Sequence, residues 1–398
     1  MNILYVCHRF PYPPTRGGKI RPFNMIRHLS RQGHNVIVAS LTRSDEESRE
    51  AQGIRDYCDE FIFEQVNKPV AVLRMVGSLS TTSPASMGYF YSPRLKSRID
   101  ALLAEHRFDL IFVHCSSVAP YVADVLGIPK MLDFGDMDSQ KWLIYSKFRR
   151  FPMSMGYRLE STKLQQAEVA LAKKFDFCTC TTKAELNTLN SFGVPVPTDW
   201  FPNGVDTEYF RPTEKPYDPD VISFIGRMDY YPNQQCMLSF CKDVMPAICK
   251  QRPGTKLWIV GANPSRAIRD LGRLPYVTVT GSVDDVRPYV YRSAVNVAPL
   301  TIARGTQNKV LEAMAMGVPV VTSEQAAGGV DAVPNEHFLT ASTREGYRDA
   351  VLRLLENPKD REQFARRGRA RMLSHHNWEN SMNQLSLLIE KCLAASRC

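Results

Sequence analysis

The residues best suited to bind an anionic ligand lie in one stretch, ARGTQNKVLEAMAMGVPVVTS, at 303–323. A basic loop rich in amide side chains leads there into a short apolar helix, which carries a single acidic residue, Glu312. Charged residues are seldom fully buried without a partner. Lys309 lies three residues earlier on the same helical face, so an intrahelical ion pair is one interpretation. The other interpretation is that Glu312 faces a ligand.

The loop before this helix has the composition of a phosphate site. Backbone N–H groups at the start of a helix attract anions, and the helix dipole adds to that attraction. We therefore expect a diphosphate to lie against Gly305, Thr306, Gln307 and Asn308. Glu312 follows one turn further on, and a carboxylate can accept hydrogen bonds from two vicinal ribose hydroxyls. The stretch thus predicts a site for a nucleoside diphosphate.

Two other predicted strands end in side chains suited to similar chemistry. The run VISFIGRM reaches Gly226-Arg227, and the donor fork of an arginine stays charged and grips phosphate oxygens in a bidentate way. His114 follows DLIFV, where a histidine can donate to a hydroxyl or act as an acid or base near neutral pH. A structural histidine bonded to the neighbouring loop is the alternative.

Two loops of the first half add weaker candidates. The pair Gly17-Gly18 in HRFPYPPTRGGKIRP lets the backbone approach a ligand, although a plain turn would have the same composition. The segment DFGDMDSQKW contains Asp133, Asp136 and Asp138, of which Asp136 and Asp138 are the candidates to orient a hydroxyl acceptor. Binding of a metal, capping of a helix and solvation of the loop are the other interpretations of these carboxylates.

These side chains require strands that end at a common edge of a sheet. Short apolar runs alternate with longer amphipathic ones, a pattern typical of parallel α/β architecture. Apolar residues at helical spacing from Ile20 to Leu29 predict a helix that ends before Gly33. The predicted strands are NILYVCH, NVIVASL, EFIFEQ, DLIFVHC, KMLDFGD and FDFCTCTT in the first half, and VISFIGR, KLWIVGA, VTVTGSV, VNVAPLT and VPVVTSE in the second.

The alternation is interrupted once, by a segment dense in proline and turn residues at 197–220, which we interpret as a linker. This interruption predicts two Rossmann-like α/β domains with parallel sheets, at 1–196 and 221–376. The remaining residues, 377–398, predict a C-terminal helix that could pack back on the first domain. Two such domains form a central cleft, and ligands bind outside the carboxyl ends of the strands.

Composition places the chain among ordinary globular proteins. It has 398 residues, of which 44% are hydrophobic and 23% charged. No apolar window approaches the length of a transmembrane helix, and the start lacks the features of a signal peptide. The ten cysteines include no CxxC pair, which favours reduced thiols in the cytoplasm over a disulfide framework or a zinc site.

The net charge of +9 is spread along the chain, so we expect no nucleic-acid partner. One local exception is the segment 141–174, which carries eight Lys/Arg and two Glu. Nucleic acid, anionic lipid headgroups and plain solvation are the interpretations of such a segment. Its interleaved aromatic and methionine side chains make peripheral association with a membrane one expectation, and a solvated helix and loop the other.

The chain resembles the retaining GT-B glycosyltransferases of family 4 over nearly its whole length. The resemblance rests on the Gly17-Gly18 loop with LSRQGHNVIV, on His114, and on FPNGVDTEYF, FIGRMDY and LEAMAMGVPVV. It implies transfer of a sugar from a nucleoside-diphosphate sugar to an acceptor. It also implies that Arg227 contacts the donor diphosphate and Glu312 the donor ribose. Gly17-Gly18 would lie beside the diphosphate and acceptor, and His114 would approach the transferred sugar.

The resemblance implies a reaction without a cofactor or metal. The leaving diphosphate would be stabilised by Arg227, a helix N-terminus and Lys309. Retention in such enzymes is assigned to front-face attack assisted by the leaving phosphate, so no protein nucleophile is needed. The string DMD at 136–138 matches a metal-binding motif only by its spacing.

Two positions depart from the family pattern. The family usually has a second glutamate eight residues before Glu312, where this chain has Arg304, and a lysine five residues after the arginine of GR, where it has Pro232. We hypothesise that Lys309 or Arg304 supplies the missing positive charge. Arg304 could instead contact an acidic sugar or an anionic acceptor.

The phrases MDYYPN, VRPY, VAPLTIARGTQNKVLEAMAMG and DMDSQKW resemble a subgroup of sugar transferases associated with bacterial PEP-CTERM/exosortase and exopolysaccharide gene clusters. That likeness implies a cytoplasmic enzyme that works at the inner membrane on a lipid-linked or growing polysaccharide acceptor. A sugar-nucleotide 2-epimerase and a non-catalytic scaffold with an altered transferase site are the alternative functions.

Overall fold

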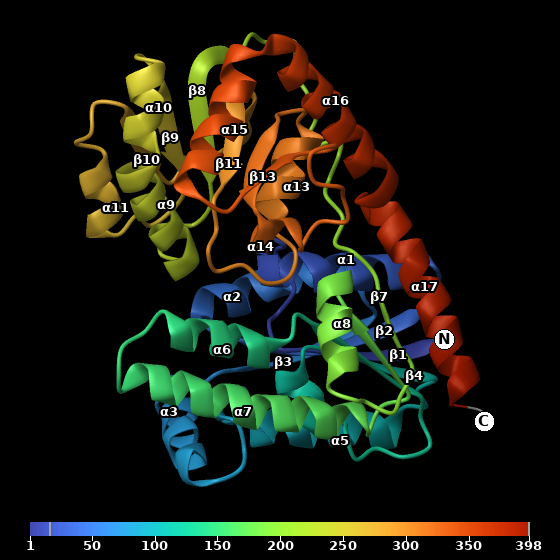
Figure 1. Cartoon of the computed structure of the whole chain (residues 1–398). Coiled ribbons are helices and arrows are strands. Elements are labelled where there is room, and N and C mark those ends of the chain that lie inside the picture. Colours follow the sequence, from blue (N-terminus) through green and yellow to red (C-terminus); the bar gives the residue numbers. More distant parts are fainter. Residues whose placement is uncertain (16, 397–398) are drawn as a thin grey trace. The chain divides into compact units, whose positions relative to one another are not determined.

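The computed structural model describes residues 1–15 and 17–396, which divide into two compact units (Figure 1). Unit 1 comprises Met1–Phe201 and the chain from Met382 onward, and unit 2 comprises Pro202–Ser381. Helix α17 (Trp378–Ala395) therefore begins in unit 2 and ends in unit 1. The predicted linker includes a short strand at its start and the first residues of another strand at its end.

Unit 1 is built on a seven-stranded sheet in the order β3-β2-β1-β4-β5-β6-β7. All neighbouring strands pair in parallel. The strands are β1 (Asn2–Cys7), β2 (Asn35–Thr42), β3 (Glu60–Gln65), β4 (Leu110–His114), β5 (Lys130–Gly135), β6 (Phe177–Cys180) and β7 (Thr198–Trp200). Every residue of β4 and β5 is buried, as expected for central strands of a parallel sheet that is covered on both faces.

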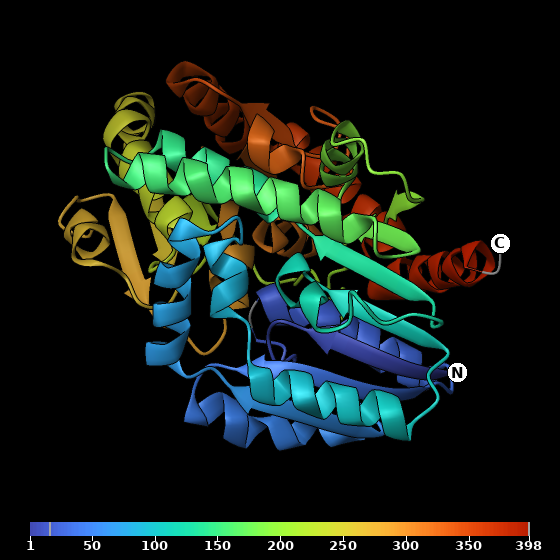
Figure 2. The same cartoon turned by 90° about the horizontal axis from the view of Figure 1, so that it is seen from below.

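The helices of unit 1 lie on both faces of this sheet (Figure 2). They are α1 (Gly17–Arg31), α2 (Asp45–Glu50), α3 (Lys68–Gly77), α4 (Ala85–Tyr89), α5 (Pro93–Glu105), α6 (Asp138–Lys147), α7 (Met153–Ala172) and α8 (Lys183–Ser191), with 3₁₀ turns η1 (Ala51–Tyr57), η2 (Ser78–Ser80) and η3 (Ser116–Tyr121). The end of α17 joins unit 1, where Ser386 Oγ lies 2.8 Å from His28 Nε2.

Unit 2 is built on a six-stranded parallel sheet in the order β10-β9-β8-β11-β12-β13. Its strands are β8 (Asp218–Ile225), β9 (Lys256–Val260), β10 (Val277–Gly281), β11 (Ser293–Ala298), β12 (Val320–Ser323) and β13 (Leu339–Ala341). Its helices are α9 (Tyr231–Asp243), α10 (Met245–Gln251), α11 (Arg266–Leu271), α12 (Arg287–Tyr291), α13 (Asn308–Ala315), α14 (Glu324–Ala327), α15 (Arg344–Glu356) and α16 (Pro358–His375), followed by α17.

The core of each unit lies between its sheet and its helices. In unit 1, Val113 and Leu132 from central strands are fully buried and belong to one apolar cluster with Leu95 and Ile99 of α5. In unit 2, Met314 of α13 packs in a cluster with Ile225. This burial, rather than the short helices themselves, fixes the orientation of the loops at the strand ends.

The expected fold class is confirmed, because both units are parallel α/β structures of the kind predicted. Each predicted strand is present, and the predicted first helix is α1, which is followed by Gly33 in a left-handed conformation with φ of 77°. Two strands were missed, β7 and β13. Each has only three residues and pairs at the edge of its sheet, so neither has the apolar run that identifies a buried strand.

Candidate functional site

The order in which the chain adds strands to the sheet of unit 2 reverses between β8 and β11. The chain passes from β8 to β9 and β10 on one side, and then returns to place β11 on the other side. Such a switch point is where open α/β sheets bind their ligands, outside the carboxyl ends of the strands. Arg227 follows β8, and the loop 299–307 follows β11 and leads into α13. The two predicted phosphate-binding groups therefore meet at this switch point.

The loop before α13 holds an unusual backbone conformation. Gly305 has φ of 61°, which suits glycine, and a Cβ added to Gly329 would lie 2.0 Å from the carbonyl oxygen of Gly305. Gln307 Nε2 donates to the carbonyl oxygen of Arg304 at 3.0 Å, so this side chain closes the loop upon itself. The Gln307 side chain thus shapes the loop, and the predicted binding of a diphosphate by the backbone N–H groups of the loop stays a prediction.

Two polar atoms of the same loop lack a protein partner. Thr306 Oγ1 and Asn308 Oδ1 are buried, and neither makes a hydrogen bond to any residue that the structure describes. A buried hydroxyl or amide usually has a partner, because leaving it unpaired costs free energy. Gln307, at the N-cap position of α13, provides no side-chain cap. The start of α13 therefore presents polar groups that a ligand could satisfy.

Lys309 occupies the space beside the end of β8. Its Nζ donates to Asn233 Oδ1 of α9 at 2.6 Å and lies 4.9 Å from the ring centroid of Phe224. A Cβ added to Gly226 would lie 2.8 Å from Asn233 Nδ2 and 3.3 Å from the same Nζ, so both side chains pack closely against this glycine. Burial lowers the pKa of Lys309 to about 8. The lysine ammonium therefore lies next to the Gly226-Arg227 turn.

The contact between Lys309 and Asn233 bears on the interpretation of Glu312 as a member of an intrahelical ion pair. The hydrogen bond of Lys309 goes to Asn233 and not to Glu312, although Lys309 still lowers the pKa of that carboxyl by its charge. Burial is the larger effect and raises the pKa of Glu312 to about 7. A simple intrahelical ion pair is therefore a poor description of the Glu312 side chain. Glu312 lies one turn beyond the loop, as predicted.

Asn233 was missed by the sequence analysis. It follows Pro232, the position at which the family pattern has a lysine, and it is buried in the first turn of α9. Its Nδ2 donates to the carbonyl oxygen of Arg227 at 2.8 Å while its Oδ1 accepts from Lys309. In the sequence, Asn233 is marked only by the neighbouring Pro232, which departs from the family pattern. Asn233 links the turn after β8 to the helix after β11.

The guanidinium of Arg227 is paired with a neighbouring carboxylate in this structure. Its Nε lies 3.1 Å from Asp229 Oδ1, and its second terminal nitrogen lies 2.6 Å from Asp229 Oδ2. The arginine side chain is 42% exposed. The hydrogen bond to Asp229 raises the pKa of Arg227, which therefore stays charged. An incoming diphosphate would have to replace Asp229 or share the guanidinium with it.

Unit 1 has a comparable switch point between β1 and β4. The chain passes from β1 to β2 and β3 on one side, and β4 lies on the other side of β1. His114 is the last residue of β4, and Gly17-Gly18 begin α1 after the loop that follows β1. Both glycines form the first turn of the helix and are exposed. His114 therefore ends one of the two strands that flank this switch point, and the Gly17-Gly18 pair follows the other.

His114 belongs to a buried chain of charged groups. Its Nδ1 lies 2.7 Å from Asp133 Oδ2, and strand pairing places the two residues opposite each other. Arg21 of α1 donates to both oxygens of Asp133, at 2.9 and 3.0 Å. Burial alone would raise the pKa of Asp133, but Arg21 and His114 together lower it well below its usual value. The ionised Asp133 therefore holds His114 Nδ1 and leaves Nε2 for a ligand.

Two further residues at this switch point were missed. His8 and Arg9 follow β1, and both His8 Nδ1 and Arg9 Nε are buried without a hydrogen-bond partner among the described residues. The rings of His8 and His114 lie 6.1 Å apart, and the Arg9 side chain would be 3.5 Å from a Cβ at Gly18. Burial lowers the pKa of His8, which favours the neutral ring. Their position at the end of the first predicted strand could have identified them in the sequence as candidate site residues.

Three side chains in this region could hold a metal ion. His8, His114 and Cys115 each offer one ligand atom, and these atoms lie within 4.8 Å of one another. Imidazole and thiolate are ligands that zinc prefers. However, burial and nearby carboxylates raise the pKa of Cys115 well above its usual value, which keeps the thiol protonated and opposes metal binding.

Asp136 and Asp138 have different partners. Asp136 Oδ1 accepts a hydrogen bond from Thr181 at 2.8 Å, and burial raises the pKa of Asp136. Asp138 is the first residue of α6 and lies 3.6 Å from Lys141. The N-cap position belongs to Met137, so the capping interpretation of Asp138 is wrong. The carboxylate still favours the helix through its place in the first turn.

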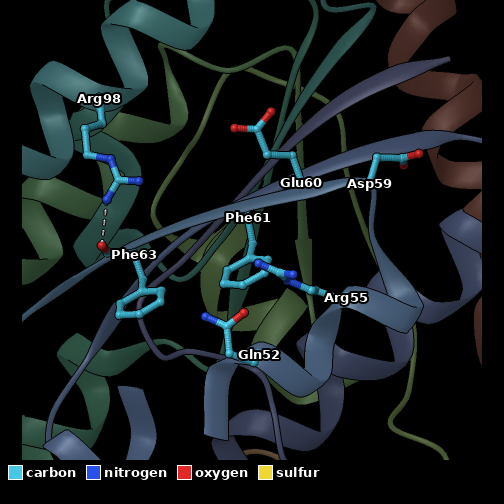
Figure 3. A pocket seen from close by; sticks show the side chains of 7 residues that line it. All are labelled: Gln52, Arg55, Asp59, Glu60, Phe61, Phe63 and Arg98. Carbon is cyan, nitrogen blue, oxygen red and sulfur yellow. Dashed lines mark hydrogen bonds between the residues drawn. The ribbon is translucent and has the colours of Figure 1, made fainter. Parts of the chain in front are cut away.

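A cavity of about 580 Å³ lies elsewhere in unit 1 (Figure 3). It is formed at the free edge of the sheet, where the parallel rings of Phe61 and Phe63 lie 6.2 Å apart and Arg98 donates to the carbonyl oxygen of Phe63. No residue predicted for the site lines it. Its remaining lining residues are Gln52, Arg55, Asp59 and Glu60. This cavity is distinct from both switch points.

Comparison with protein families identifies the class. Residues 16–209 match the model described as Glycosyltransferase Family 4, and residues 219–357 match the model described as Glycosyl transferases group 1. Together the two matches cover most of both units. The chain is therefore a GT-B glycosyltransferase of the group 1/family 4 type. No curated protein sequence shows a significant match to it.

Solved structures share the fold at low sequence identity. The sucrose-phosphate synthase of Thermosynechococcus elongatus is 17% identical with a TM-score of 0.71, and the match covers 99% of this chain and 100% of that one. Anabaena HepE in complex with UDP is 13% identical with a TM-score of 0.71, over 98% and 100% of the two chains. Another HepE structure contains UDP-glucose, at 14% identity and a TM-score of 0.69, over the same shares of the two chains.

Within the described part of the chain, no helix has both the length and the apolar character to span a membrane.

Proposed function

We propose that the protein transfers a sugar, with retention of anomeric configuration, from a nucleoside-diphosphate sugar that binds at the switch point of unit 2. The main support for this proposal is a pair of buried atoms without a protein partner, Thr306 Oγ1 and Asn308 Oδ1, at the start of α13. Two groups suited to the two ends of a nucleoside diphosphate, Lys309 and Glu312, follow them on α13. The fold relatives that contain UDP or UDP-glucose make uridine the first base to test.

The donor diphosphate is proposed to lie against the loop 304–308 with Lys309 and Arg227 as cationic partners. Lys309 takes over the role of the missing family lysine, because Asn233 holds its Nζ beside the Gly226-Arg227 turn. Arg304, at the position of the missing glutamate, adds positive charge on the other side of the loop. Glu312 accepts hydrogen bonds from the ribose hydroxyls in its ionised form.

The proposed reaction breaks the bond between the anomeric carbon and the diphosphate oxygen. The acceptor hydroxyl oxygen forms the new bond on the same face, and its proton passes to the departing phosphate. Negative charge develops on the leaving diphosphate, where Arg227, Lys309 and the N–H groups of α13 stabilise it. No metal or cofactor takes part in this proposal. His114 offers Nε2 to a sugar or acceptor hydroxyl, because Asp133 fixes its other nitrogen.

The acceptor is proposed to be lipid-linked or a growing polysaccharide, in bacterial exopolysaccharide synthesis of the PEP-CTERM-associated kind. This part rests on the sequence phrases that resemble that subgroup. It places the enzyme in the cytoplasm at the inner membrane, with the basic segment 141–174 as the contact. A 2-epimerase or a non-catalytic scaffold would use the same donor site. Transfer needs an acceptor, epimerisation does not, and a scaffold shows neither reaction.

Thermal unfolding with a panel of nucleoside diphosphates and sugar nucleotides tests the donor site. A ligand that binds only the folded state stabilises it by about 2.7 kcal/mol at a hundredfold excess over its Kd. We expect one nucleotide to raise the Tm of the native protein and not that of Glu312→Ala. Glu356→Ala is the matched control, since Glu356 is an exposed glutamate at the end of α15 in the same unit. No shift with any nucleotide would contradict the proposal.

A further inference from the structure

Two separate segments of unit 1 expose large apolar side chains. They are 70–79, which contains most of α3 and η2, and 148–159, which contains the α6–α7 connection and the first turns of α7. Leu73 is 72% exposed, Phe151 77% and Met155 62%. Of the twenty large apolar side chains that the described residues expose, eleven fall in these two segments. Helix α3 buries only Ala71, so its apolar side chains are not explained by the core.

The two segments belong to elements that lie next to each other. Lys163 of α7 donates to the carbonyl oxygens of Ser78 and Leu79, at 2.9 and 3.1 Å. Glu160, one turn earlier, accepts from the backbone N–H groups of Ala85 and Ser86 at the start of α4. Figures 1 and 2 both show α3 beside the beginning of α7. We call the exposed side chains of 70–79 and 148–159 the apolar face.

The sequence windows that contain the apolar face carry an excess of positive charge. The sequence from 65 to 99 contains five Lys/Arg and no Asp or Glu, and the sequence from 139 to 159 also contains five and none. Ordinary surfaces mix the two signs, and protein interfaces are depleted in lysine. Exposed apolar side chains accompanied by an excess of cations are the composition that binds an anionic lipid surface, by insertion and by attraction to headgroups.

A second copy of the chain fits this surface less well. A symmetric dimer would place the same patch on both sides of its interface. The basic residues of one copy, such as Lys147 and Arg150, would then face those of the other, and like charges in contact oppose association.

We propose that the apolar face docks the protein on an anionic lipid bilayer, with Leu73 and Phe151 entering the interface and Lys147 and Arg150 meeting headgroup phosphates. This extends the membrane contact from 141–174 to α3, a segment that is far away in sequence. The purpose of the docking, which is to bring the enzyme to a lipid-linked acceptor, rests on the proposed function. The docking itself does not depend on the donor site.

Sedimentation of the full chain with vesicles tests the proposal. We expect binding to vesicles that contain phosphatidylglycerol, little binding to phosphatidylcholine alone, and loss of binding at high salt. Leu73→Ser with Phe151→Ser, and separately Lys147→Glu with Arg150→Glu, should each reduce binding at least tenfold. Leu126→Ser is the control, because Leu126 is 88% exposed in the same unit but lies outside the apolar face.

Equal binding by native protein and both double variants would overturn the proposal, as would failure of the native protein to bind anionic vesicles. A dimer in solution that the Leu73→Ser and Phe151→Ser substitutions dissociate would assign the face to a second copy instead. The Tm of each variant shows whether it folds. The shift in Tm caused by nucleotide, measured on the same preparations, separates a failure of docking from a failure of the donor site.

Discussion

Lys309 Nζ donates a hydrogen bond to Asn233 Oδ1 across 2.6 Å and thereby joins the helix after β11 to the helix after β8. Through Asn233 Nδ2 the connection continues to the backbone of Arg227. Both helices begin at the carboxyl ends of neighbouring strands in the sheet. The sequence has no lysine at the expected position near 232, and this bond shows how a lysine from another part of the chain occupies the same region.

We predict that Lys309→Ala weakens donor binding between roughly tenfold and a hundredfold, because a hydrogen bond to a charged group contributes about 1.5–3 kcal/mol. Asn233→Ala should weaken it less, since the lysine remains but loses its fixed position. Isothermal titration with the nucleotide identified by thermal unfolding measures both. Lys242→Ala, an exposed lysine of α9, should have no effect. Unchanged affinity in Lys309→Ala would remove this lysine from the donor site.

We predict a bell-shaped dependence of donor affinity on pH. Ionised Glu312 binds ribose hydroxyls, and its pKa is about 7, so affinity should increase as the pH rises through 7. Charged Lys309 binds the diphosphate, and its pKa is about 8, so affinity should decrease as the pH rises above 8. Titrations across this range test both limits. The Glu312→Gln variant should lose the increase near 7 and keep the decrease, and a flat profile in the native protein would argue against both assignments.

Arg304 replaces a glutamate that usually contacts the sugar, so its role can be tested separately. We predict that Arg304→Ala raises the donor KM if the guanidinium binds the diphosphate, or lowers kcat if it positions the sugar or acceptor. Steady-state kinetics with varied donor distinguishes the two results. An enzyme with unchanged kcat and KM would show that the residue has neither role.

We predict that removal of Asp133 destabilises unit 1 as well as reducing activity. Asp133→Ala would leave the guanidinium of Arg21 buried without its carboxylate, a change that typically costs about 3–5 kcal/mol. Urea unfolding followed by fluorescence measures the loss. By contrast, His114→Ala should lower kcat with a much smaller change in stability. Comparable stability losses in the two variants would indicate that His114 has mainly a structural role.

We predict that transfer continues after extensive treatment with EDTA, since the proposal assigns the leaving-group charge to Arg227, Lys309 and backbone N–H groups. Activity assays before and after chelation, with added magnesium or manganese as the comparison, provide the measurement. Loss of activity that one of these cations restores would contradict the metal-independent mechanism. Cys115→Ser should leave activity unchanged, because its protonated thiol takes no part.

The sequence determined the features that depend on local pattern. Apolar runs identified the central strands, and their polar ends identified Arg227, His114 and the loop 304–308, because strand and loop preferences are encoded in adjacent residues. The same local reasoning missed β7 and β13, which are too short to show a pattern. It also left open whether Glu312 pairs with Lys309, its nearest charged neighbour along the helix, or faces a ligand.

Only the tertiary structure decided which of these residues meet. Lys309 and Asn233 are separated by 76 positions, and His114 and Asp133 by 19. Their contacts arise because the order of strands in each sheet places particular strand ends side by side, and that order is set by how the helices cover the sheet rather than by local composition. The same packing buried one ring nitrogen of His8 and Arg9 Nε at one switch point, and it left Thr306 Oγ1 and Asn308 Oδ1 without protein partners at the other.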